Sequence, residues 1–69
     1  MTEDFELIRA SYPDRDDLVA EIWFKNEMIA LIEEDGGIEL FKERVDPSVF
    51  DDPDFFRMLE AAKKRLGIV

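Results

Sequence analysis

The chain has 69 residues, of which 18 are acidic and 9 basic, so its formal net charge at pH 7 is −9. A chain of this length is expected to form a single domain over residues 1–69. The acidic charge disfavours direct binding to nucleic acid or an anionic membrane and favours a basic protein as partner. The chain has no cysteine, no histidine and no glycine-rich phosphate loop. We therefore expect neither an enzyme nor a protein that binds a cofactor or a metal.

The start of the chain gives no sign of export or membrane insertion. Residues 1–5 lack the basic and apolar regions of a signal peptide, and no apolar run in the chain approaches the length of a membrane span. We therefore expect a cytoplasmic protein.

Residues 5–10 form the first predicted element. Their alternation favours a strand, although a short helix capped by Thr2 is an alternative. Pro13 ends either element, and the charged residues 14–17 predict a solvated turn before the next strand.

Two apolar runs and two turns predict the centre of a sheet. Residues 18–25 and 28–33 are rich in β-branched and aromatic side chains, and Asn26-Glu27 between them is the predicted two-residue loop. Asp35-Gly36 predicts a second tight turn, because glycine adopts positive φ at little steric cost. The fold class is therefore α+β, with a three- to four-stranded antiparallel meander over about residues 5–43 and a helix packed on one face.

The loop lengths decide which residues share a sheet face. With two-residue loops, Phe24 lies opposite Ile29 and Leu31 lies opposite Leu40. The first face is then almost wholly apolar and should be buried; it holds Leu18, Ala20, Ile22, Phe24, Ile29, Leu31, Ile38 and Leu40. A three-residue loop at either turn shifts the pairing by one residue and moves the side chains beyond it to the other face.

Residues 53–66 carry the signals of a C-terminal helix. Asp52 is the predicted N-cap, Pro53 occupies the first helical position, and Gly67 is the predicted stop. An apolar stripe should cover the first sheet face; it consists of Phe55, Leu59, Ala62 and Leu66.

The second sheet face combines apolar and acidic side chains, a composition that suits a protein interface. Its candidate residues for partner binding or a dimer interface are Trp23, Met28, Ile32, Phe41, Glu21, Glu34 and Glu39. Two alternatives also account for this face. The N-terminal segment or the loop over residues 45–50 folds across it, or two copies of the chain pair there as a homodimer.

A pattern of short motifs covers most of the chain from residue 14 to residue 66. It comprises DRDDLVAEIWF at residues 14–24, residues 28–32, Glu34 with Gly36-Gly37, Ile38-Glu39, Phe56, Leu59-Glu60 and residues 62–66. This pattern resembles small bacterial immunity proteins of polymorphic toxin systems. The resemblance implies a protein that binds and blocks a cognate toxin, often a nuclease, with acidic residues opposing the toxin's basic surface. The competing hypothesis is a homo-oligomeric structural or accessory protein that uses the same face as its subunit interface.

Overall fold

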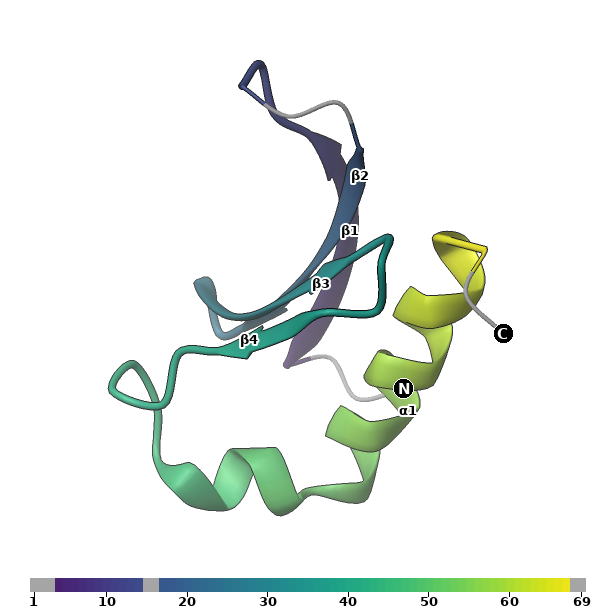
Figure 1. The fold of residues 1–69 in the computed structure, drawn as a ribbon. Helices are drawn as coiled ribbons and strands as arrows, with labels where there is room; N and C mark the ends of the chain where they lie inside the picture. Colours follow the sequence, from purple (N-terminus) through teal and green to yellow (C-terminus); the bar gives the residue numbers. More distant parts are fainter. Residues whose placement is uncertain (1–3, 15–16, 68–69) are drawn as a thin grey trace.

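The computed structural model of the chain describes residues 4–14 and 17–67 (Figure 1). Four strands form one antiparallel sheet in sequence order: β1 (Phe5–Ser11), β2 (Leu18–Phe24), β3 (Glu27–Glu33) and β4 (Ile38–Leu40). A 3-10 helix, η1 (Pro47–Asp51), leads into helix α1 (Pro53–Arg65), which packs against one face of the sheet. The predicted α+β meander with a C-terminal helix is thus confirmed, and the first element is a strand. Thr2 and residues 15–16 of the predicted charged turn lie outside the described residues.

The turn between β2 and β3 lies one residue earlier than predicted. It consists of Lys25 and Asn26, which have φ angles of 50° and 68°. Positive φ at both central residues is typical of a type I′ turn, whose twist matches that of the strands on either side. Phe24 therefore pairs with Glu27, and the predicted loop Asn26-Glu27 is wrong.

A β-bulge follows this turn. Trp23 pairs with Met28, whereas the preceding Ile22 pairs with Ala30, so that Ile29 is an extra residue on β3. A bulge of this kind bends its strand and increases the local twist. It also shifts by one residue the register that the turn sets.

The turn and the bulge together exchange residues 30–33 of β3 between the sheet faces, and the exchange matters most for Leu31 and Ile32. Leu31 was predicted on the first face and Ile32 on the second. In the structure Leu31 pairs with Glu21 and faces away from α1, whereas Ile32 pairs with Ala20 and belongs to the core beneath the helix. The prediction was wrong for both residues, because a register difference of one residue reverses every side chain beyond it.

The second hairpin differs from the prediction by one residue as well. Its loop has three residues, 34–36, because the Glu33 N–H donates to the Gly37 carbonyl at 2.8 Å. Gly36 has a φ of 96°, the conformation that closes such a loop. The longer loop reverses the face exchange of the first hairpin, and Leu40 lies on the helix side as predicted.

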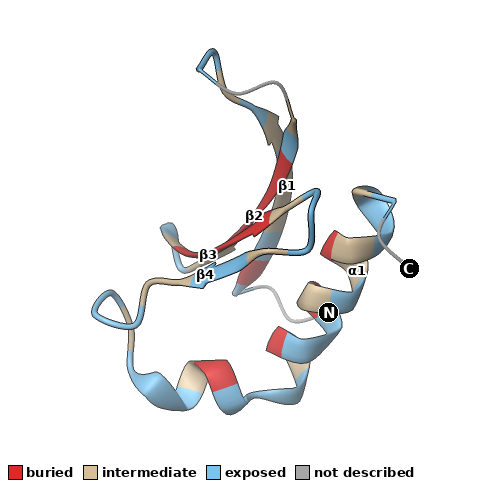
Figure 2. Ribbon diagram, in the orientation of Figure 1, coloured by how far each residue is buried: buried red, intermediate tan, exposed pale blue. Residues whose placement is uncertain are grey.

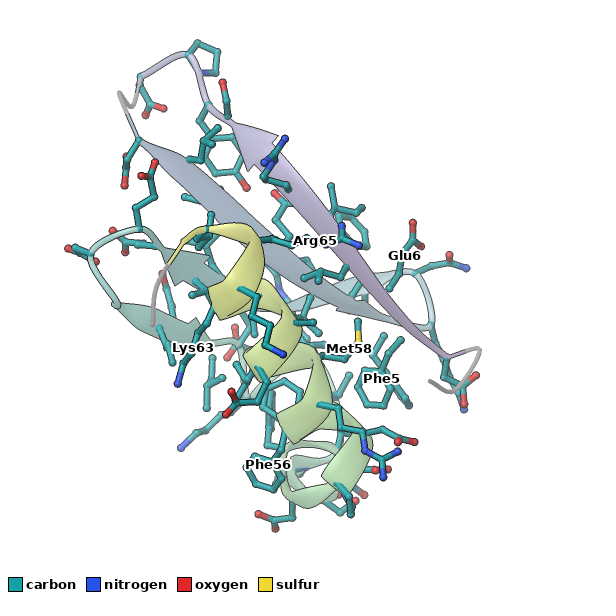
Figure 3. All side chains as sticks on the ribbon, turned by 90° about the vertical axis from the view of Figure 1, so that its right-hand side faces the viewer. Phe5, Glu6, Phe56, Met58, Lys63 and Arg65 are labelled. Atoms are coloured by element: carbon teal, nitrogen blue, oxygen red, sulfur yellow. The ribbon has the colours of Figure 1, made fainter. Side chains whose placement is uncertain are left out.

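One apolar core lies between the sheet and α1. Its buried members are Phe5, Ala20, Ile22, Ile29, Ala30, Ile32, Phe50, Phe55, Met58 and Ala62. Figure 2 shows buried positions along the central strands and on the side of α1 that faces them. In Figure 3, Phe5 and Met58 lie close together between α1 and the sheet. The core thus joins the first strand to the last helix of the described chain.

The ends of α1 follow the predicted signals. The Asp52 carboxylate accepts a hydrogen bond from the Asp54 N–H at 2.9 Å, and Pro53 begins the helix. Gly67 has a φ of 78°, and its N–H donates to the Lys64 carbonyl at 3.2 Å. Both the N-cap and the glycine stop are therefore confirmed.

Candidate functional site

The sheet face that points away from α1 carries the candidate site, and we name it the open face. Residues paired across antiparallel strands share a face, so the register defines its members. They are Glu6, Ile8, Ala10, Val19, Glu21, Trp23, Met28, Leu31, Glu33 and Glu39. β1 and β2 bend with the inner side of the bend toward this face, and none of the described helices lies across it (Figure 1). The open face is thus available for an interaction in the described part of the chain.

Two rows of paired residues cross the open face. One row runs over all four strands, through Ile8, Glu21, Leu31 and Glu39. The neighbouring row runs over three strands, through Glu6, Trp23 and Met28. The structure therefore brings together four of the predicted site residues, Glu21, Trp23, Met28 and Glu39.

Glu21 is the most distinctive residue of the open face. Only 8% of it is exposed, although it carries a carboxylate. Oε1 accepts a hydrogen bond from Trp23 Nε1 at 3.0 Å, and Oε2 accepts one from the Tyr12 hydroxyl. No lysine or arginine among residues 4–14 and 17–67 forms an ion pair with it. A buried carboxylate usually has a cationic partner, whereas here two neutral donors satisfy it.

The surroundings of Glu21 combine a buried floor with half-exposed aromatic side chains. Val19 and Leu31, on the same face, are buried. Tyr12 and Trp23 are half-buried. An aromatic ring with a polar group that is held by a hydrogen bond is a rigid contact surface, because few of its torsions are free. The open face is therefore organised around its carboxylate before any partner binds.

Two predicted site residues have structural roles elsewhere. Ile32 has 0% exposure and lies in the core beneath α1, so it is not available to a partner. Glu34 lies in the turn between β3 and β4, where its Oε1 accepts a hydrogen bond from the Leu18 N–H. This bond ties the turn to the start of β2, and it accounts for Glu34 without a functional role.

Phe41, another predicted site residue, lies at the margin of the sheet and is half-buried. Its N–H donates to the Ile29 carbonyl at 2.9 Å, which continues the pairing of β4 with β3. The Arg44 guanidinium lies 4.5 Å from the centre of its ring and donates to the Met28 carbonyl at 2.9 Å. Arg44 therefore covers one side of the Phe41 ring with a cation–π contact.

Sequence reasoning missed the contribution of Tyr12, the residue directly before the predicted break at Pro13. The available signal was Glu21 itself, the one acidic residue within the otherwise apolar residues 18–24. A carboxylate at a central strand position needs donors, and tyrosine and tryptophan are the aromatic residues that supply them.

Comparison of the chain with protein-family models, curated proteins and solved structures gave no significant match. Within the described ranges, no helix is long and apolar enough to cross a membrane. The same residues contain no group of three or more acidic side chains placed to hold a metal ion. The function of the open face has to be inferred from its own geometry.

Proposed function

We propose that this chain is a small acidic protein-binding domain whose open face binds a basic protein. The observation that carries the proposal is Glu21, a buried carboxylate whose donors within the described residues are both neutral, flanked by the half-buried rings of Tyr12 and Trp23. Aromatic side chains around a desolvated polar group are typical of the energetic centre of a protein interface. The net charge of −9 favours a partner of opposite charge.

Within this class we favour a bacterial immunity protein that neutralises a toxin by direct binding. Two features support it: the motif resemblance described above and the acidic charge. A toxin that attacks nucleic acid needs a basic surface, and an acidic inhibitor complements that surface. Long-range attraction would speed association, and burial of Trp23 would slow dissociation.

A homo-oligomer that uses the open face as subunit interface is the second candidate, and the charge distribution argues against it. The open face contains Glu6, Glu21, Glu33 and Glu39 and no basic residue. A two-fold interface brings the same patch of both copies together. Carboxylates would then face carboxylates, which is electrostatically unfavourable. A basic partner would not be repelled by these carboxylates.

The proposal is tested by affinity capture from a lysate of the native bacterium at low salt. The baits are the tagged chain and two variants of it. Trp23→Ala removes the open-face indole, and Phe56→Ala removes an aromatic ring that is 52% exposed on α1. We expect the unmodified chain and Phe56→Ala to retain the same basic protein in fixed ratio and Trp23→Ala to lose it. Circular dichroism establishes that each variant is folded.

Two results would overturn the proposal. Retention of the partner by Trp23→Ala as strongly as by Phe56→Ala would place the interface outside the open face. A dimer or higher oligomer of the chain in light scattering, disrupted by Trp23→Ala, would support the homo-oligomer.

A further inference from the structure

The hydrogen bonding of Glu21 leaves part of its acceptor capacity unused. A carboxylate offers about four acceptor positions, two on each oxygen. Trp23 Nε1 occupies one position on Oε1, and the Tyr12 hydroxyl occupies one on Oε2. These are the interactions of the Glu21 side chain in the described residues, so each oxygen retains one free acceptor position.

This pattern of free acceptor positions suits an arginine side chain better than a lysine side chain. An arginine guanidinium presents two parallel N–H groups, which bind the two oxygens of a carboxylate at the same time. A lysine ammonium is a point charge and does not need two oxygens. Guanidinium groups also stack on aromatic rings, and the Tyr12 and Trp23 rings are half-exposed beside the carboxylate.

We infer that Glu21, Tyr12 and Trp23 together form a site for one arginine side chain of the partner protein. The inference rests on the proposed function and names the chemical group that the open face recognises. Trp23 and Tyr12 position the carboxylate, and Glu21 supplies the charge. Because the site is desolvated, a partner without an arginine at this position leaves the carboxylate buried and unpaired, which penalises the wrong partner.

The single tryptophan of the chain makes the site directly observable. The probe is N-acetyl-arginine amide, titrated while the NMR signal of the Trp23 indole N–H is recorded. Parallel titrations use N-acetyl-lysine amide and the neutral isostere N-acetyl-citrulline amide. We expect a saturable shift with the arginine amide, binding about 10-fold weaker with the lysine amide, and no saturable shift with the citrulline amide.

Two matched variants separate the site from the general acidity of the face. Glu21→Gln and Glu39→Gln remove the same charge, but Glu39 is exposed on β4, whereas Glu21 is buried. We expect Glu21→Gln to weaken arginine-amide binding by about 10-fold or more and Glu39→Gln by about two-fold or less. If Glu21→Gln does not fold, the contrast between arginine and citrulline amides in the unmodified chain still decides the question.

Several outcomes would overturn the inference. They are the absence of any saturable shift with the arginine amide, an equal response to the citrulline amide, and equal weakening by Glu21→Gln and Glu39→Gln.

Failure of the proposed function is distinguishable from these outcomes. Capture of a basic protein that Glu21→Gln does not weaken leaves the binding face intact without an arginine site. Binding of the arginine amide without any captured protein leaves the site intact and removes the proposed function.

Discussion

At the scale of single residues, Met58 is the centre of the contact between α1 and the sheet. It has no exposed surface, whereas Leu59, which the apolar stripe placed at the centre, is half-buried. The buried positions of the helix are Phe55, Met58 and Ala62, spaced by three and four residues. This spacing still follows one face of a helix. The face is therefore rotated slightly from the predicted one, toward the Phe5 side chain on β1.

We predict that Met58→Ala lowers the free energy of unfolding by about 2–5 kcal/mol, because it empties a fully packed position. Leu59→Ala should cost less, because part of that side chain is already in water. Phe56→Ala, at an exposed position of the same helix, should change stability by less than about 1 kcal/mol. Urea denaturation of the three variants measures the order. A larger loss for Leu59→Ala than for Met58→Ala would contradict it.

Asp46 couples the stability of η1 to pH. Its carboxylate accepts hydrogen bonds from Ser48, first from the backbone N–H at 3.0 Å and then from the side chain, and these lower the pKa of Asp46 below its ordinary value of 3.8. A pKa that is lower in the folded state means that the unfolded chain binds the proton more readily. The stabilisation is therefore present above pH 3.8 and is lost as the pH falls through the folded-state pKa.

We predict that Asp46→Asn removes this part of the pH dependence. Between about pH 5 and pH 3, the free energy of unfolding should decrease more steeply for the unmodified chain than for the variant. Urea denaturation at a series of pH values measures both curves. Parallel curves would mean that the Ser48 hydrogen bonds do not distinguish the two protonation states of Asp46.

At the scale of the elements, the two hairpins control which side chains reach α1. The type I′ turn and the Ile29 bulge set the register of β3, and the three-residue loop after β3 restores Leu40 to the core side. Gly36 is the residue on which that loop depends, because its φ of 96° is unfavourable for any residue with a side chain.

We predict that Gly36→Ala destabilises the second hairpin by about 1–2 kcal/mol. Apart from the residue itself and its two chain neighbours, no heavy atom of the described residues lies within 4 Å of the Cβ that the substitution adds, so the loss reflects backbone conformation and not a clash. Gly36→Asn should cost less, since asparagine tolerates positive φ better than alanine. Thermal unfolding of both variants measures the difference. Equal losses would indicate that the turn changes its conformation on substitution.

The strands, the helix and its caps could be predicted because each depends on local signals, such as the β-branched and aromatic composition of β2 or the Asp52-Pro53 start of α1. The sheet face on which Ile32 lies could not be predicted, because it depends on the exact position of the turn and on the bulge at Ile29. No local residue pattern indicates that bulge. The candidate site was predicted only in part, because some of its residues are placed by local signals and others by contacts between distant residues. Trp23 lies near the first turn and was placed correctly on the second face. The contact of Tyr12, which follows β1, with Glu21 on β2 depends on the tertiary arrangement, and its only local signal is an acidic residue among apolar ones.

At the scale of the whole molecule, charge is distributed unevenly. Seventeen of the 18 acidic residues lie in residues 1–54, which include the whole sheet. The last turn of α1 carries three basic residues, Lys63, Lys64 and Arg65, which complement the negative end of the helix dipole. Figure 3 shows Lys63 and Arg65 on this turn. The part of the molecule that contains the sheet therefore carries most of the negative charge, and it repels other acidic surfaces.

We predict that added salt stabilises the free protein and slows its association with a basic partner. Salt screens repulsion within a chain of net charge −9, so the free energy of unfolding should rise as NaCl increases from about 0.01 to 0.5 M. Stopped-flow association with the captured partner should slow over the same range. The stabilisation by salt should be smaller for a Glu39→Gln, Glu43→Gln double variant, because it removes two negative charges from exposed side chains. A fall in stability with salt would show that attractive pairs dominate.

The order of the elements along the chain has a consequence for biosynthesis. All four strands lie before residue 41, whereas the helix that covers their apolar side begins only at Pro53. Because translation proceeds from the N-terminus, the ribosome synthesises the meander before it synthesises α1. Any state in which α1 has not docked leaves Ile22 and Ile32 without their cover. Truncation before Pro53 would make this exposure permanent.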